Sequence, residues 1–265
     1  MELWQIIAAL IQGLVEWLPM SSQGMVILFA HNIGAAPLES LLALSFWLHL
    51  GTMSAVVVRY RKEVLHVLTL KDRTLFRLLL IATVGTVITS LPLYYALKTG
   101  VLVPRGELLN ILVGLLLLLT GVVLYLTSRR TPVSENTDTG RSITDRASFV
   151  TGLVQGFSVL PGLSRSGVTV STLLMHRVEK ETAFIFSFLM SVPAVVGILC
   201  LELLGEGASF GGVSPVDLIV METIVFLTGL ASMEALLRLA RRVPFWKLCI
   251  VLALVAITFG MLTLL

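Results

Sequence analysis

The chain has 265 residues, of which 56% are hydrophobic and only 13% are charged, and its mean hydropathy is +0.96. Too little polar sequence remains to cover a soluble globule, so the composition excludes a water-soluble fold and indicates an integral membrane protein. A net charge of +3 would suggest a nucleic-acid partner in a soluble protein. In a membrane protein the basic residues instead indicate which connections face the cytoplasm, and no nucleic-acid partner is expected.

The apolar segments form two similar sets in chain order. The first set is a broken segment at 2–34 followed by predicted spans at 39–60, 75–97 and 107–128. After a polar linker at 129–145, the second set is a broken segment at 146–177 followed by predicted spans at 183–204, 216–239 and 245–264. A helix needs about 20 residues to cross the hydrocarbon core, and each arm of a broken segment is shorter. We therefore predict two re-entrant helical hairpins.

Three spans in each half predict an inverted arrangement, because an odd number of crossings reverses the direction of the second half. The predicted fold is an all-α membrane protein with one membrane domain at 1–265. It is an inverted repeat of two halves, 1–128 and 146–265, each with a re-entrant hairpin and three transmembrane helices. One hairpin then enters from each side of the membrane, and the two tips can meet near its middle.

The basic residues indicate the orientation. All 19 Lys and Arg residues except Lys98, Arg105 and Arg165 fall in the connections at 59–77, 129–147, 177–182 and 238–247. These connections share one face of the predicted topology, and the positive-inside rule makes that face cytoplasmic. We expect a multi-pass protein of the cell membrane with both termini outside.

One phrase occurs twice, once in each broken segment. Residues 12–24 read QGLVEWLPMSSQG and residues 155–167 read QGFSVLPGLSRSG, which puts Ser21 and Ser164 at the same offset. Pro and Gly leave backbone groups without helical partners, and in a membrane such breaks persist only where they line a protein-walled cavity. Paired breaks in two halves therefore predict a binding site between the hairpins.

The second phrase has the chemistry of a phosphate site. Pro161 and Gly162 break the helix, and Ser164, Arg165 and Ser166 then begin a new one. Helix N-termini and a guanidinium both favour a bound phosphate. The alternative is that Arg165 pairs with Glu16 only to hold the hairpins together, since a lone charge in the membrane is expensive.

The first phrase supplies the other candidate groups. Glu16 shares a helix face with Gln12 and can hold a divalent cation or act as a base. Ser21 and Ser22 follow the break at Pro19, either as a nucleophile activated by Glu16 or as a helix cap. His49 lies inside a predicted span, which makes it a functional candidate, with a helix–helix hydrogen bond as the alternative.

These phrases, with HLGTMSAVVV at 49–58 and FSFLMSVPAVVG at 186–197, resemble the undecaprenyl-diphosphate phosphatase family of bacterial and archaeal membranes. The resemblance covers essentially the whole chain. It implies removal of the terminal phosphate from a polyprenyl diphosphate lipid, a divalent cation (Mg²⁺ or Ca²⁺), and a site reached from the outer face. Its acid positions fall on Gln12 and Glu16, with Glu16 as the metal ligand. The remaining positions fall on Ser21, Ser22, Ser164, Arg165, Ser166, Gly167 and Thr169.

Two features of the chain bear on this chemistry, an accepted family variant at Gln12 and a departure from the family pattern at Met25. Gln12 replaces one acid, which leaves a single carboxylate for a cation, and Met25 stands where the family often has histidine. His49 therefore becomes a candidate acid, base or ligand. We expect catalysis by Glu16, Ser22, Arg165 and His49, with the nucleophile being Ser22, His49 or water. The alternative function is a translocase of an anionic polyprenyl lipid. A homodimer is a further expectation.

Overall fold

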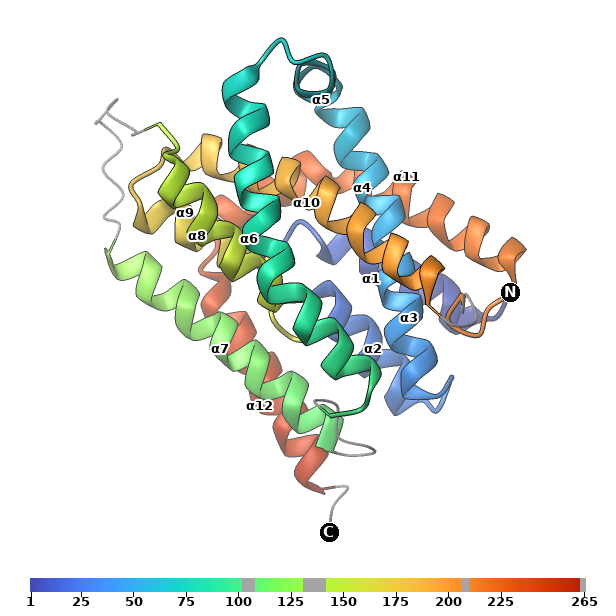
Figure 1. The fold of residues 1–265 in the computed structure, drawn as a ribbon. Helices are drawn as coiled ribbons and strands as arrows, with labels where there is room; N and C mark the ends of the chain where they lie inside the picture. The colour runs from blue at the N-terminus through green and yellow to red at the C-terminus, as the bar shows by residue number, and fades with distance from the viewer. Residues whose placement is uncertain (102–107, 131–141, 206–209, 263–265) are drawn as a thin grey trace.

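The computed structural model describes residues 1–101, 108–130, 142–205 and 210–262, and every regular element in these ranges is a helix (Figure 1). Six helical segments are long and apolar enough to cross a membrane. They are the pair α3–α4 (Leu38–Trp47 and His49–Arg59), α6 (Arg73–Lys98), α7 (Leu108–Arg130), α10 (Lys180–Leu204), α11 (Pro215–Arg242) and α12 (Phe245–Leu262). The prediction of an all-helical, multi-pass membrane protein is confirmed. Most of the predicted linker lies outside the described residues.

Each predicted hairpin consists of two short helices around a break. The first contains α1 (Leu3–Val15) and α2 (Ser22–Asn32); the second contains α8 (Asp145–Gly156), the 3-10 turn η1 (Phe157–Val159) and α9 (Arg165–Met175). The four arms have 13, 11, 12 and 11 residues, so none is long enough to cross the membrane alone. The breaks contain Pro19 and Pro161, which cannot donate a helical hydrogen bond.

The first span differs from the uninterrupted helix expected from hydropathy. It breaks at Leu48, between α3 and α4, and the break is next to His49. The His49 ring nitrogen Nδ1 lies 2.6 Å from the carbonyl oxygen of Ser45, one turn earlier. A side chain that takes a carbonyl acceptor from the backbone ladder is a known cause of helix breaks. A further short helix, α5 (Arg61–Leu68), lies in the basic connection that follows.

Glycines place both hairpins directly against long helices. Gly13 in α1 lies against α11, where an added Cβ would collide with Thr228 and come within 3.0 Å of the Val225 carbonyl oxygen. Gly156 in α8 lies in the same way against α6, where a Cβ would collide with Thr89 and come within 2.7 Å of the Thr86 carbonyl oxygen. Only a residue without a side chain permits these approaches. Elsewhere, α7 and α12 pack side by side (Figure 1).

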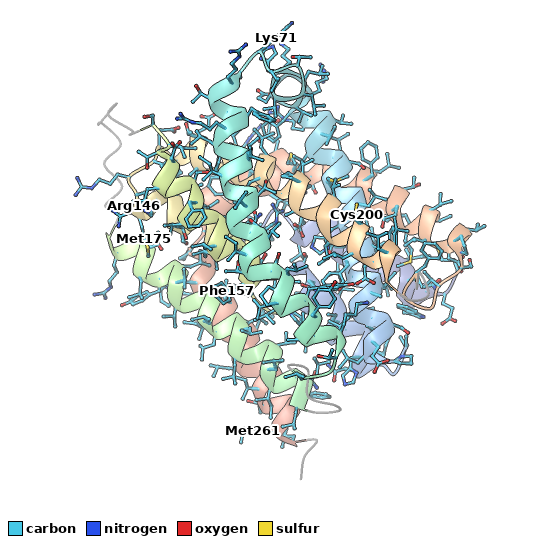
Figure 2. The ribbon with its side chains drawn as sticks, viewed as in Figure 1. Lys71, Arg146, Phe157, Met175, Cys200 and Met261 are labelled. Carbon is cyan, nitrogen blue, oxygen red and sulfur yellow. The ribbon has the colours of Figure 1, made fainter. Side chains whose placement is uncertain are left out.

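Apolar side chains also cover the outside of the molecule. Those on the outer faces of the long helices are exposed, among them Leu115, Leu119, Val251, Leu254 and Val255. Basic Lys71 and apolar Met261 lie at opposite ends of the view in Figure 2. A broad exposed apolar surface of this kind is typical of contact with lipid. Inside, the fully buried Trp17 donates from its indole nitrogen to the Gly229 carbonyl oxygen over 3.0 Å, which anchors the chain immediately after Glu16.

Candidate active site

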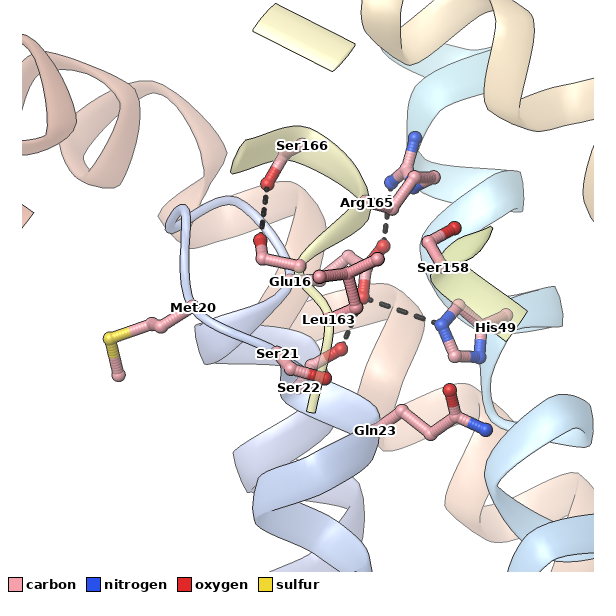
Figure 3. Close-up of a pocket in the computed structure, with 11 residues that line it drawn as sticks. Glu16, Met20, Ser21, Ser22, Gln23, His49, Ser158, Leu163, Arg165 and Ser166 are labelled. Atoms are coloured by element: carbon pink, nitrogen blue, oxygen red, sulfur yellow. Dashed lines mark hydrogen bonds and ion pairs between the residues drawn. The ribbon is translucent and has the colours of Figure 1, made fainter. Parts of the chain in front are cut away.

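Two helix N-termini meet at one pocket. Helix α2 begins at Ser22 and α9 begins at Arg165, and the residues before them, Ser21 and Ser164, are their N-caps. The Ser21 hydroxyl accepts from the Gly24 N–H over 3.1 Å, and the Ser164 hydroxyl accepts from the Gly167 N–H over 3.2 Å. Both first turns line the pocket in Figure 3. Helix N-termini carry partial positive charge and unbonded N–H groups, so the pocket is suited to an anion.

The two hairpin tips are joined by hydrogen bonds and by backbone contact. The Ser21 hydroxyl also accepts from the Gly162 N–H over 3.1 Å, and the Ser166 hydroxyl donates to the Leu18 carbonyl oxygen over 3.2 Å. A Cβ at Gly24 would lie only 2.9 Å from the Gly162 nitrogen. Gly162 itself has φ +109°, a conformation that favours glycine. Hydrogen bonds of Ser21 and Ser166 therefore join the two halves of the chain.

A buried ion pair lies between the tips. Arg165 Nη2 is 2.6 Å from Glu16 Oε1, and the guanidinium also donates through Nη1 to the Ser187 carbonyl oxygen over 3.2 Å. The Glu16 residue is 6% exposed. Arg165 Nε is buried without a hydrogen-bond partner among the described residues. The predicted pairing of Arg165 with Glu16 is present, and one donor of the guanidinium remains free for a ligand.

The second oxygen of Glu16 is surrounded by donors. Ser22 Oγ donates to Glu16 Oε2 over 2.5 Å, and Gln12 Nε2 donates to the same oxygen over 3.1 Å. His49 Nε2 lies 3.6 Å from it. Because His49 Nδ1 faces a carbonyl oxygen, Nδ1 carries a proton and Nε2 is the ring nitrogen turned toward the pocket (Figure 3). The structure thus brings Glu16, Ser22, His49 and Arg165 together.

Three predicted binding residues do not line this pocket. Gln12 is fully buried and contacts Glu16; Gly167 caps against Ser164; Thr169 bonds to Arg165 and Ser187 through its hydroxyl. Gln12 and Gly167 contact residues that line the pocket, and Thr169 contacts Arg165 and Ser187. Direct contact of these three residues with a substrate stays a prediction. Ser22, Ser21, Ser164 and Ser166 do line it.

Sequence reasoning missed three residues near the reacting groups. Gln23 and Ser158 line the pocket, and Ser187 holds the Arg165 guanidinium through its carbonyl oxygen. Gln23 also donates to the Ser45 hydroxyl over 3.2 Å, which ties α2 to α3. Gln23 and Ser158 lie inside the two repeated phrases, and this position is the signal in the sequence that could have identified them. Ser187 contributes a backbone oxygen, for which side-chain type gives no signal.

The polar pocket adjoins a larger apolar cavity. The pocket has a volume of about 20 Å³, little more than a water molecule requires. The neighbouring cavity has about 270 Å³ and lies mainly between α6 and α10, with Val87, Leu91, Ile198 and Leu201 in its walls. Gln23, His49, Ser158 and Arg165 line both spaces. An anionic group and an apolar chain can therefore occupy adjacent spaces.

Comparison with known proteins places the chain in a family. A family model described as bacitracin resistance protein BacA matches residues 5–258. The chain belongs to the BacA family. An undecaprenyl-diphosphatase from Methanothrix thermoacetophila is 39% identical over 264 residues, which are 98% of this chain and 94% of that protein. Proteins of the same name from Haloarcula marismortui and Methanopyrus kandleri are 35% and 34% identical over 97% of this chain, and 96% and 95% of their own lengths.

The divalent cation implied by the family resemblance is not matched by the residues of this BacA-family chain. The described residues contain no group of three or more His, Cys, Asp and Glu side chains placed to hold a metal ion. Glu16 is the single carboxylate lining the pocket, and both of its oxygens already accept hydrogen bonds. Glu16 as a metal ligand stays a prediction, and no step below depends on a cation.

Ser21→Ala is expected to destabilise the protein more than loss of another pocket hydroxyl. The substitution leaves the N–H groups of Gly24 and Gly162 without their acceptor, and losing an N-cap costs about 1–2 kcal/mol. Thermal unfolding in detergent measures the effect. Ser158→Ala is the matched control, because that hydroxyl donates only to Gln155 within its own hairpin. Equal melting temperatures of the two variants would contradict a role for Ser21 in joining the tips.

Proposed function

We propose that this protein removes the terminal phosphate from undecaprenyl diphosphate, giving the monophosphate and inorganic phosphate and recycling the lipid carrier for envelope glycan synthesis. The observation that supports it most strongly is the convergence of two helix N-termini and Arg165 at a pocket beside an apolar cavity. An anion site of this kind suits the diphosphate, and the cavity suits an isoprenoid tail. The relatives' names favour hydrolysis over the translocase alternative.

The proposed architecture is an inverted repeat with two re-entrant hairpins. Its support is the equivalent packing of the two halves, in which Gly13 meets Thr228 of α11 and Gly156 meets Thr89 of α6. Each glycine follows the glutamine of its repeated phrase, so equivalent residues make equivalent contacts. Charge bias supports both termini outside and a site reached from the outer face of the cell membrane. A homodimer stays a prediction.

In the proposed complex, the diphosphate replaces Glu16 as the partner of Arg165. The pocket is too small for a diphosphate while the ion pair closes it, so binding requires the guanidinium and carboxylate to separate. Arg165 then contacts the terminal phosphate with its planar fork, including the Nε donor that has no partner in the pair. The first isoprene units extend into the cavity between α6 and α10.

Ser22 is the nucleophile that the geometry favours among the three candidates. Its Oγ donates directly to Glu16 Oε2, the arrangement of a nucleophile and its general base. Glu16 takes the Ser22 proton as Oγ bonds to the terminal phosphorus. The bond from this phosphorus to the bridging oxygen breaks, and undecaprenyl monophosphate leaves with the electron pair. Arg165 and the N–H groups of both helix starts stabilise the negative charge in transfer.

The second half of the reaction releases the phosphate. Water attacks phosphoserine 22, the phosphorus–Oγ bond breaks, and Glu16 returns its proton to Oγ. His49 Nε2, the ring nitrogen turned toward the pocket, accepts the proton that the water gives up. Glu16 and His49 thus have separate roles although both lie beside Ser22.

Phosphate release from undecaprenyl diphosphate by the purified protein tests the proposed function. Arg165→Lys is expected to lower kcat/KM by about 10²-fold or more, because lysine keeps the charge and loses the planar, two-pronged contact with phosphate. A melting curve establishes that the variant is folded. Lys98→Met, on a span end away from the pocket lining, is the control for loss of a basic side chain from an ion pair with a buried carboxylate. Activity of Arg165→Lys within about threefold of wild type would mean that Arg165 only pairs helices.

His49→Ala is expected to trap the covalent intermediate. Without the imidazole, hydrolysis of phosphoserine slows by about 10²-fold, the usual contribution of a positioned acid or base, while its formation continues. Acid quenching after mixing with lipid labelled in the terminal phosphate measures the label on the protein. The label accumulates in His49→Ala and is absent in Ser22→Ala. Label on the Ser22→Ala protein would assign the nucleophile elsewhere, and a wild-type rate for His49→Ala would make His49 a packing residue.

Gly197→Phe tests the tail position. Gly197 lines the apolar cavity, and no atom lies within 4 Å of a Cβ built there, so a side chain can be added at this position without a clash at its Cβ. KM for the long lipid is expected to rise roughly tenfold or more, as crowding of an apolar pocket does. Val196→Phe, one residue earlier and 46% exposed, adds the same ring outside the cavity. Equal KM values for the two variants would place the tail elsewhere.

A further inference from the structure

We infer that this chain has no resident divalent-cation site and that its cation arrives bound to the diphosphate of the substrate. The inference rests on the proposed function, and it concerns how a cation would be held in this particular pocket. A member of the family with two acids in the first phrase can offer two carboxylates. Here Gln12 takes the place of one of them.

The remaining carboxylate is already engaged on both oxygens. Glu16 Oε1 accepts from Arg165, and Oε2 accepts from Ser22 and Gln12. A cation on Oε1 must either displace Arg165 or take the remaining lone pair of that oxygen beside it. Displacing Arg165 would leave a buried guanidinium without its counter-ion, which is strongly unfavourable. A cation placed beside Arg165 without displacing it would be repelled at a distance of a few ångströms in a low dielectric.

The other groups around Glu16 do not supply the missing negative charge. The other side-chain oxygens that line the pocket belong to Gln23 and to serines, and they are neutral. Gln12 Oε1 is also neutral and is buried without a hydrogen-bond partner among the described residues. The amide has its Nε2 toward Glu16, because the opposite orientation would put two acceptors together. His49 offers a nitrogen, whereas Mg²⁺ and Ca²⁺ prefer six or more oxygen ligands. Neutral oxygens without a second carboxylate do not hold a dication against the charge of Arg165.

A bound diphosphate makes the pocket more favourable for a cation. It brings several negative charges into the pocket and takes over Arg165, which frees Glu16 Oε1. Mg²⁺ is usually held by one or two carboxylates together with substrate phosphates. The ligand set of this pocket is therefore complete only when phosphate oxygens are added to Glu16 and the neutral oxygens of the lining, so the cation binds together with the diphosphate.

Electron paramagnetic resonance of Mn²⁺ tests the inference directly on the full-length protein in detergent. Mn²⁺ takes the same oxygen ligands as Mg²⁺, and the signal of the free ion falls as it binds. Without lipid, the wild type is expected to bind no stoichiometric Mn²⁺. Gln12→Glu supplies the second carboxylate and is expected to bind one ion with a Kd at least about tenfold lower than any wild-type value. With a non-hydrolysable polyprenyl methylenediphosphonate, the wild type is expected to bind one ion, and Glu16→Gln to bind it at least about tenfold more weakly.

The wild-type measurements decide the outcome even if Gln12→Glu does not fold. One Mn²⁺ per lipid-free wild-type protein, lost in Glu16→Gln, would show a resident site and overturn the inference. Absence of Mn²⁺ from the diphosphonate complex would overturn it as well, because the substrate would then not carry the cation. Failure of the proposed function is distinguishable, since it would appear as no phosphate release from undecaprenyl diphosphate with any cation.

Discussion

The ion pair between Glu16 and Arg165 is the interaction on which the arrangement of the site depends. Either charge alone would be costly in a membrane, and separating such a pair by removing one partner costs several kcal/mol. The two residues are 149 positions apart, so they meet only when the two broken segments face each other. The tips are fixed there by Ser21, Ser166 and the close approach of Gly24 to Gly162.

The same pair explains how a charged pocket remains stable before substrate binds. Arg165 keeps a counter-ion, and Glu16 keeps donors on both oxygens, so the buried charges are compensated. A diphosphate is the kind of ligand able to exchange with Glu16, because it offers Arg165 more negative charge in a matching geometry. In the proposed mechanism, this exchange leaves Glu16 next to Ser22, where it acts as the general base. Substrate binding and activation of the Ser22 nucleophile then occur together.

Gln12 distinguishes this site from that of a family member with two acids in the first phrase. An amide there donates to Glu16 and holds its orientation, whereas a second carboxylate would repel it unless a cation lay between them. Gln12 therefore suits a pocket in which Arg165, rather than a resident metal ion, balances Glu16. His49 Nε2 lies 3.6 Å from the same carboxylate. Met25, which stands where the family often has histidine, has no titratable group.

The sequence alone determined the helical membrane fold, the six long apolar helices and the two phrases that contain the site, because hydropathy and Pro–Gly breaks are local properties. It also indicated Glu16 and Arg165 as partners, since a buried charge needs a counter-ion. Only the tertiary structure decided that Ser21 of the first phrase bonds to Gly162 of the second and that the Ser187 carbonyl oxygen holds Arg165. The cavity between α6 and α10 was equally invisible in the sequence. These features depend on contacts between distant segments and on backbone atoms, which residue type and spacing do not encode.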